Sequence, residues 1–343
     1  MGKTEFLEAL NGGIPERVPM FLRNMTLGMD VLNVRTTDVF SQGFNAELSS
    51  DCIAAFQRMT GQDAVIGCTH SAAFIIEQFG GEMKYPEYGI PVPKSHPLMD
   101  RREFSGCDTE PKGKMLSLLE SYRQVREKLP DTAVVLNVTG PFTKSGSLVG
   151  MEQLSMLIEL DRDVLDELLA LGFELHSRVI EEAASDGSCD AGILAAATDN
   201  PDLFGESVFR EVCVPWMRRS ADLFHKFGLP VIGHPHGTFA SEDSDLSDAI
   251  LAMGCDGFHY PENNDISLLR ERLGGKLCLL GGTDIVPTIL NGPADRIEKE
   301  TEQHLRTFSD SSYVFMTSCS MHRGLPLDNV KTVCDTVRRF TRN

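Results

Sequence analysis

Short apolar runs that alternate with longer amphipathic stretches constrain the fold of this chain more than any other feature. Eight such runs occur, at 18–23, 64–68, 133–138, 191–197, 229–234, 257–260, 276–282 and 313–318. Each is almost continuously apolar, as a strand covered on both faces of a parallel sheet must be. The intervening stretches have helical patterns, for example SDLSDAILAMG, whose final Gly254 suits a helix C-terminus. Eight buried strands alternating with helices predict an α/β fold, the (β/α)8 TIM barrel.

A single domain accounts for the whole length of 343 residues. Such a barrel takes ~250 residues, and the additional length lies mainly between the second and third runs, at 79–130. We therefore expect one barrel domain over 1–343, in which residues 1–14 form an N-terminal helix. The alternative is an open doubly wound sheet, but no GxGxxG fingerprint follows the first run and the sequence has no Walker loop.

The charge balance argues against two classes of partner. The chain has 32 Lys and Arg against 50 Asp and Glu, a net charge of −18. Because nucleic acids and anionic membrane surfaces attract an excess of cations, we expect neither as a partner. No apolar run reaches the ~18 residues of a membrane span, and the N-terminal sequence lacks the apolar stretch of a signal peptide. Nine scattered cysteines indicate reduced thiols. Together these features predict a cytoplasmic protein.

Polar side chains collect at the carboxyl ends of the expected strands, where barrel enzymes build their active sites. Arg23 can clamp a substrate carboxylate or phosphate with its two-pronged donor set, and an internal salt bridge is the alternative. Asp199 and Asp284 are candidate catalytic groups, with N-capping of the following helix as the alternative for each. His70 and Asn137 are candidates for binding a cofactor.

The segment His234-Pro235-His236 is the strongest indication of a metal site. Alternate residues of an extended segment project to the same face, so both imidazoles can reach one point. With the thiolate of Cys319 they would give zinc three protein ligands and an open fourth position, the arrangement of a catalytic site. Glu262 is the candidate to complete the fourth position. Spacing alone also permits a hydrogen-bonded turn that leads into Gly237.

Five segments carry a resemblance to a known family. They are PERVPMFLR, GPFTKSGSLVGMEQL, PVIGHPHG, LCLLGGTDIVPTILNGPADRIEKE and TSCSMHRGLPLDNVKTV, in this order along nearly the whole chain. They resemble the uroporphyrinogen decarboxylase superfamily, whose fold is a (β/α)8 barrel. The decarboxylases carry an Arg-Gln-Ala-Gly-Arg segment after the first strand and an Asp after the second. This chain keeps only Arg23 of that segment and has no Asp in GCTHSA, so it is more similar to the corrinoid-dependent methyltransferases such as the methylcobamide:coenzyme M methyltransferases.

The methyltransferase branch holds zinc with a His-x-Cys pair after strand 5 and a Cys after strand 8. This chain matches at His234 and Cys319, and His236 stands where the branch has Cys. One thiolate and two imidazoles would leave a zinc site with a charge of about +1. The resemblance implies bound Zn²⁺ and methyl transfer between a small methylated compound or thiol and the cobalt of a separate corrinoid protein. The chain has no Asp-x-His-x-x-Gly corrinoid signature of its own.

Two other functions stay open at this point. The first is a metal-free decarboxylase or lyase that uses Arg23 and Asp199 on a small acid. The second is a barrel that binds a ligand without turnover.

Overall fold

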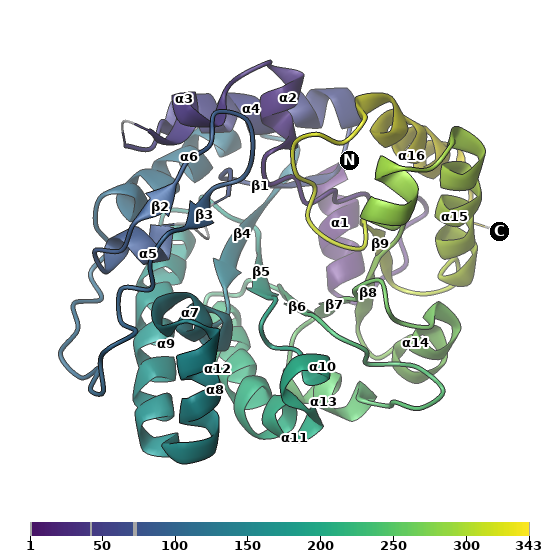
Figure 1. The fold of residues 1–343 in the computed structure, drawn as a ribbon. Coiled ribbons are helices and arrows are strands. Elements are labelled where there is room, and N and C mark those ends of the chain that lie inside the picture. The colour runs from purple at the N-terminus through teal and green to yellow at the C-terminus, as the bar shows by residue number, and fades with distance from the viewer. Residues whose placement is uncertain (1, 42, 71–73, 343) are drawn as a thin grey trace.

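Seven parallel strands form a curled sheet at the centre of the molecule in a computed structural model that describes residues 2–41, 43–70 and 74–342. Their order is β1-β4-β5-β6-β7-β8-β9, and Figure 1 shows them curving around a common axis with helices outside. The bounds are β1 Ala64–Ile66, β4 Ala133–Thr139, β5 Ala191–Ala196, β6 Val231–Pro235, β7 Gly257–His259, β8 Cys278–Gly281 and β9 Tyr313–Phe315. Nearly every residue of these strands is buried, as their apolar composition predicts. The fold is the expected TIM-barrel type.

The run at 18–23 differs from the expectation because it is not a regular strand. It lies between β9 and β1 as an extended segment with one isolated parallel bridge, from Met20 to Phe315. Pro19 has no N–H to donate, but its carbonyl accepts from Phe315 at 2.8 Å. On the β1 side the main-chain N–H of Met20 donates to the Asp63 carboxylate at 2.8 Å. The segment thus closes the ring between β9 and β1 with a mixture of main-chain and side-chain hydrogen bonds.

The same closure predicts a stability effect at Gln62. Its Oε1 accepts the buried N–H of Leu22 at 2.7 Å. Gln62→Ala leaves that N–H without a partner, so we expect the free energy of unfolding to fall by about 1–3 kcal/mol. Urea unfolding followed by circular dichroism measures this change. Gln303→Ala, the same substitution at an exposed position, serves as the control, and equal midpoints for both variants would contradict the prediction.

Eight helices, which follow the strands or the closing segment along the chain, make up most of the outer layer. They are α4 Ala46–Thr60, α6 Lys114–Lys128, α9 Arg162–Ser185, α12 Val214–Lys226, α13 Ser247–Ala252, α14 Ile266–Leu273, α15 Ala294–Thr307 and α16 Leu327–Arg339. Each presents an apolar stripe to the sheet. In α16 this stripe consists of Val330, Val333, Cys334 and Val337, spaced as one face of a helix requires. Gly254 follows α13 with φ +68°, so this helix ends where the sequence predicts.

The remaining elements surround the ends of the barrel. They are α1 Gly2–Leu10, α2 Leu27–Val31, α3 Thr36–Phe40, α5 Phe74–Gln78, α7 Pro141–Val149, α8 Met151–Leu160, α10 Pro201–Phe204, α11 Glu206–Val208, two π-helical segments at Phe209–Cys213 and Ile285–Leu290, and the antiparallel pair β2 Met83–Lys84 and β3 Val92–Pro93. The β2–β3 loop lies against α3, where Thr36 donates to the carbonyls of Glu87 and Gly89. The expected extra length between strands is therefore a rim structure (Figure 1).

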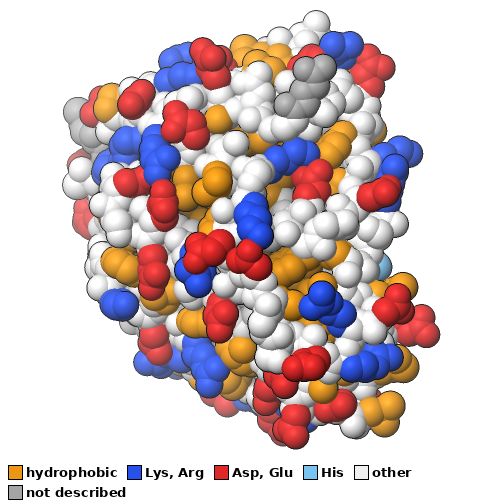
Figure 2. Space-filling model, turned by 90° about the vertical axis from the view of Figure 1, so that its left-hand side faces the viewer, with side chains coloured by type: hydrophobic (Ala, Val, Ile, Leu, Met, Phe, Trp, Pro, Cys, Tyr) orange, Lys and Arg blue, Asp and Glu red, His pale blue; other side chains and the backbone are white. Residues whose placement is uncertain are grey.

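Acidic and basic side chains are interspersed on the face drawn in Figure 2, with apolar side chains between them. Many of these charges form surface ion pairs, such as Arg123 with Glu182 at 3.0 Å and with Asp186 at 2.6 Å. Within the described residues, every helix is too short or too polar to span a lipid bilayer.

Candidate active site

His234, His236 and Cys319 come together at the carboxyl end of the sheet. His234 lies in β6 and His236 directly after it, while Cys319 lies on the segment that follows β9. The Nε2 atoms of the two imidazoles are 3.2 Å apart. The Sγ atom of Cys319 is 4.0 Å from Nε2 of His234 and 3.8 Å from Nε2 of His236. We call these three side chains the His-His-Cys group.

The geometry of this group fits a single zinc ion. Zinc bonds of ~2.05 Å to nitrogen and ~2.3 Å to sulfur in a tetrahedral site give ligand separations of about 3.3 Å between nitrogens and about 3.6 Å between nitrogen and sulfur. The observed separations of 3.2, 3.8 and 4.0 Å lie close to these values. Nδ1 of His234 is 3.1 Å from the carbonyl oxygen of His259, which can only accept, so Nδ1 carries the hydrogen and Nε2 presents a lone pair. The donor set therefore suits a borderline-soft cation.

The charges around Cys319 favour its thiolate. Burial alone would raise the pKa of the thiol, but the hydrogen bond and charge of His236 and the charge of Arg23 hold it below its ordinary value. A thiolate is the form that binds metals and attacks electrophiles.

Arg23 is buried and has only an uncharged partner among the described residues. Its Nε and Nη2 donate to Oδ1 of Asn137 at 3.1 and 2.8 Å, which joins two predicted site residues. Burial lowers the pKa of Arg23, and no described carboxylate lies within ion-pair distance of it. The internal salt bridge considered from the sequence is therefore not found in the described part of the chain. A buried guanidinium without a carboxylate partner is suited to an anionic ligand.

His70 and His322 lie close enough to Arg23 to feel its charge. Their ring centroids are 5.8 Å apart, and burial lowers the pKa of His70 to about 3 and that of His322 to about 4, so both imidazoles are neutral. Nδ1 of His70 is buried without a described partner, and the residue has φ +39°, an uncommon backbone conformation for a non-glycine residue. Its unused ring nitrogen is available to a ligand.

Asp199 is a buried carboxylic acid at the carboxyl end of β5. Its Oδ2 accepts a hydrogen bond from the Thr143 hydroxyl at 2.8 Å, and its Oδ1 is buried with no described partner. Burial raises the pKa of Asp199 to about 7, against the opposing effects of the Thr143 bonds and of nearby His236. A carboxyl group that titrates near neutrality can accept and return protons under ordinary conditions.

The alternative function of Asp199 as a helix cap is wrong. The N-cap of α10 is Asn200, whose side chain accepts from the N–H of Asp202. Asp284 precedes the π-helical segment Ile285–Leu290 but makes no side-chain cap bond either. Neither candidate catalytic aspartate is accounted for by capping.

Glu262 is not part of the His-His-Cys group, in contrast to the expected fourth ligand. Among the described residues only His234, His236 and Cys319 bring their donor atoms together as a metal site. The carboxylate of Glu262 instead acts on Asp284, whose pKa is raised to about 6 by burial and by the charges of Glu300 and Glu262. Glu262 and Asp284 line the same cavity.

A cavity of about 460 Å³ opens beside Cys319. Its lining combines Glu262, Asp284 and His322 with the apolar side chains of Val286, Leu290 and Leu325. A cavity of this size and character can hold a small substrate next to the sulfur.

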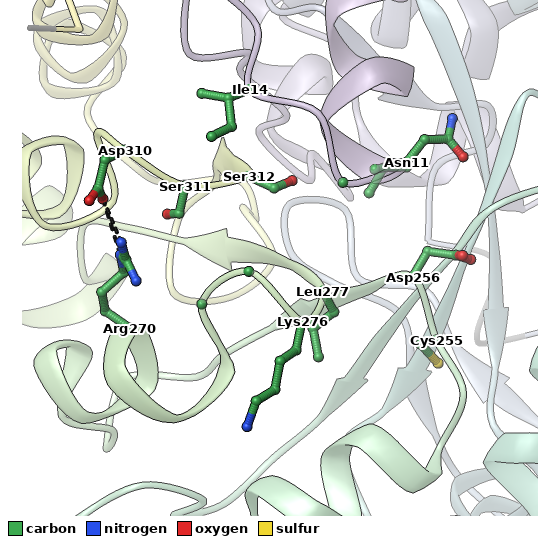
Figure 3. Close-up of a pocket in the computed structure, with 14 residues that line it drawn as sticks. Asn11, Ile14, Cys255, Asp256, Arg270, Lys276, Leu277, Asp310, Ser311 and Ser312 are labelled. Carbon is green, nitrogen blue, oxygen red and sulfur yellow. Dashed lines mark hydrogen bonds and ion pairs between the residues drawn. The ribbon is translucent and has the colours of Figure 1, made fainter.

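A larger hollow of about 540 Å³ lies at the opposite end of the sheet (Figure 3). Its residues precede strands rather than follow them: Asp256 comes before β7, Lys276 before β8 and Ser312 before β9. The Arg270–Asp310 ion pair, 2.8 Å long, lies at its edge. Because chemistry in this fold takes place at the carboxyl ends of the strands, we assign the active site to the end with the His-His-Cys group.

Two contacts in the site were missed by sequence reasoning. Thr143 fixes Asp199, and its position near the start of the helix in GPFTKSG is the only signal that the sequence offers. His259, at the end of β7, contacts His234 and the carbonyl of Thr317, which lies two residues before Cys319.

The chain is similar over its whole length to proteins of a known family. The family described as uroporphyrinogen decarboxylase (URO-D) matches residues 1–340. The methylcobamide:CoM methyltransferase MtaA of Methanosarcina barkeri is 23% identical over 341 residues, which cover 96% of this chain and 96% of that protein. A uroporphyrinogen decarboxylase of Hamiltonella defensa is 33% identical over 97 residues, but these cover only 28% of this chain and 27% of that protein.

Among solved structures, a methyltransferase from Methanosarcina mazei superposes with a TM-score of 0.86 at 21% sequence identity, over 99% of this chain and 98% of that chain. This similarity establishes the shared fold. The resemblance stated from the sequence is confirmed, including the similarity to the corrinoid-dependent methyltransferase branch. The chain belongs to the uroporphyrinogen decarboxylase (URO-D) family.

Proposed function

We propose that this protein is a zinc-dependent methyltransferase that moves a methyl group between a small methylated compound or thiol and the cobalt of a separate corrinoid protein. The observation that carries the proposal is the His-His-Cys group, whose three donor atoms converge at the carboxyl end of the barrel. The full-length similarity to a methylcobamide:CoM methyltransferase supports it. We further propose that residues 1–343 act as one catalytic domain in the cytoplasm.

His234, His236 and Cys319 would hold the zinc, and the cavity beside Cys319 would hold the substrate. Bound zinc would act as a Lewis acid toward a thiol or toward the heteroatom of a methylated donor. With one thiolate and two imidazoles the ligand set carries less negative charge than the His-Cys-Cys set of the resemblance, so the protein offsets less of the metal charge.

Asp199 is the proposed proton acceptor and donor of the reaction. When a thiol is the methyl acceptor, the S–H proton passes to the Asp199 carboxylate, and in the reverse direction the carboxylic acid returns it. The raised pKa of about 7 suits both directions, and Thr143 holds the carboxyl group in place. Asp284, with a raised pKa of about 6, is the second candidate acid or base at the cavity.

Arg23 is the proposed binding group for an anionic part of the substrate. Asn137 fixes the guanidinium through two hydrogen bonds to one oxygen, and Nη1 makes no hydrogen bond with a described residue. His70, which is near Arg23, offers its Nδ1, which has no partner among the described residues. Arg23, Asn137 and His70 would together orient a small polar molecule or a polar group of the corrinoid.

The partner would dock at the open end of the barrel above the His-His-Cys group. Segments that follow the strands expose large apolar side chains: Tyr88 is 62% exposed, Leu203 64% and Val286 61%. Exposed apolar side chains around an active-site mouth support contact with another protein. Such docking would bring a corrinoid near the site.

The proposal is tested with purified protein. Metal analysis is expected to find one zinc per chain, and methylcob(III)alamin is expected to lose its methyl group to a thiol, visible as the absorbance of cob(I)alamin. Protein that cannot be loaded with zinc but releases CO₂ from a small acid would overturn the proposal in favour of the metal-free decarboxylase.

The pH dependence of zinc binding follows from the same donor set. Protons compete with zinc for Cys319 and for both imidazoles, so affinity is expected to fall as the pH is lowered from about 8 to about 6. Despite burial, His236 and Arg23 hold the pKa of Cys319 below its ordinary value, which favours the thiolate that zinc requires. Arg23→Met removes one of these charges and is expected to move half-maximal zinc binding to higher pH. Competition titrations with a chromogenic chelator at several pH values measure this, and a shift to lower pH would contradict it.

A further inference from the structure

His259 contacts His234 and the segment that carries Cys319, and we infer that it is a positioning residue that sets the geometry of the zinc ligands. It ends β7 and its side chain is fully buried. The inference deepens the proposed function and rests on it, because it concerns how the protein holds the metal. His259 itself is not a ligand, since it is not part of the His-His-Cys group.

The first contact is with His234. The two rings are stacked, with centroids 4.0 Å apart and planes inclined by 21°. The main-chain carbonyl of His259 also accepts the Nδ1 hydrogen of His234 at 3.1 Å. The stack fixes the plane of the His234 ring, and the hydrogen bond leaves Nε2 as its ligand atom. Hydrogen bonds of this kind commonly orient the imidazoles of zinc sites.

The second contact is with the segment that carries Cys319. Nε2 of His259 lies 2.8 Å from the carbonyl oxygen of Thr317. Because a carbonyl only accepts, Nε2 carries the hydrogen and donates it. The hydroxyl of Thr317 donates in turn to the carbonyl of Cys319 at 2.7 Å. One buried side chain therefore fixes the ring of one ligand and the backbone that leads to another.

The competing explanation is that the His259 ring only fills space in the core, as any buried ring does. The two explanations separate when the ring and its N–H are removed one at a time. Phenylalanine keeps a ring that can stack but has no donor for Thr317. Glutamine carries an N–H near the position of Nε2, whereas the shorter asparagine reaches only toward the position of Nδ1.

The experiment measures zinc affinity and the geometry of the site directly, without an activity assay. The zinc Kd of His259→Phe is expected to rise by about 10- to 100-fold relative to the unsubstituted protein, and the visible absorption bands of the Co²⁺-loaded protein are expected to shift. His259→Gln is expected to bind zinc more tightly than His259→Phe and His259→Asn, because it restores the donor to Thr317.

His176 supplies a matched control. It is also a buried imidazole, 3.1 Å from the Ser220 hydroxyl and 3.4 Å from the Thr139 carbonyl, but it lies outside the site. His176→Phe is expected to lower the melting temperature of the metal-free protein while leaving the zinc Kd and the Co²⁺ spectrum unchanged.

The outcomes distinguish this inference from the proposed function. If the unsubstituted protein binds zinc and His259→Phe matches its Kd and Co²⁺ spectrum, the positioning role of His259 is overturned and the proposed function stands. If the unsubstituted protein binds no zinc, the proposed function fails and the inference fails with it. If His259→Phe does not fold, the remaining pair decides, because equal zinc Kd values for His259→Gln and His259→Asn overturn the inference.

Discussion

Replacing Cys319 with alanine is expected to remove most of the bound zinc and nearly all methyl transfer while leaving the barrel folded. Cys319 supplies the only sulfur in the His-His-Cys group, and loss of one of three protein ligands is expected to weaken zinc binding on the order of 10²-fold or more. The residue lies on the segment after β9 and is only partly buried, so its removal leaves the core intact. Metal analysis, the cob(I)alamin assay and circular dichroism measure the three expectations.

Cys255→Ala is the matched control for this substitution. Cys255 is also a partly buried free cysteine, but it lines the hollow at the opposite end of the sheet. This variant is expected to keep its zinc and its activity. His234→Ala should lose zinc and methyl transfer as Cys319→Ala does, because it removes a nitrogen ligand from the same proposed zinc site. Full zinc content in folded Cys319→Ala protein would contradict the assignment of the ligands.

Hydrophobic patterning predicted most of the sheet because strands of a parallel barrel are buried on both faces and are therefore visible as apolar runs. The run at 18–23 has the same composition, yet it forms only one bridge to β9. On the β1 side, the N–H groups of Met20 and Leu22 donate to the side chains of Asp63 and Gln62, and Asp63 donates its own N–H to the Met20 carbonyl. A pattern of apolar residues does not reveal that side chains replace part of a ladder, and so the first of the eight expected strands was wrong as a regular element.

The two histidines of the His-His-Cys group were predictable for a local reason, since alternate residues of an extended segment face one point. Cys319 was predicted from its place after the last apolar run, and the resemblance agreed with it. The interactions that tune the site were not predictable in this way. Arg23 and Asn137 are separated by 114 positions, Thr143 and Asp199 by 56, and His259 and Thr317 by 58. Each contact depends on how the strands are ordered around the ring. Glu262 illustrates the opposite case. It follows β7, which is the neighbour of the strand that carries His234, yet its carboxylate is not part of the group.

Asp199→Asn is expected to slow methyl transfer by about 10²- to 10⁴-fold, the usual contribution of a positioned acid or base, with zinc content unchanged. Asparagine has nearly the same shape and can still accept a hydrogen bond from Thr143, but it cannot take up the thiol proton. Asp199 lies outside the His-His-Cys group, so the metal is retained. Rates with a thiol acceptor, measured together with metal content, separate this effect from the loss of zinc expected for Cys319→Ala.

The dependence of the methyl-transfer rate on pH tests the role of Asp199 more specifically. The carboxylate form accepts the proton, and burial raises the pKa of Asp199 to about 7, so the rate should increase with pH through this value and level off above it. Asp199→Asn should lose this limb of the profile. Thr143→Val removes a hydrogen bond that favours the carboxylate, and it is therefore expected to move the same limb to higher pH without abolishing activity. Asp202→Asn, an exposed aspartate three residues along the chain, is the control that should leave both rate and profile unchanged. If the pH-dependent limb persists in Asp199→Asn, another group transfers the proton. Asp284, whose raised pKa is about 6, would then be the next residue to substitute.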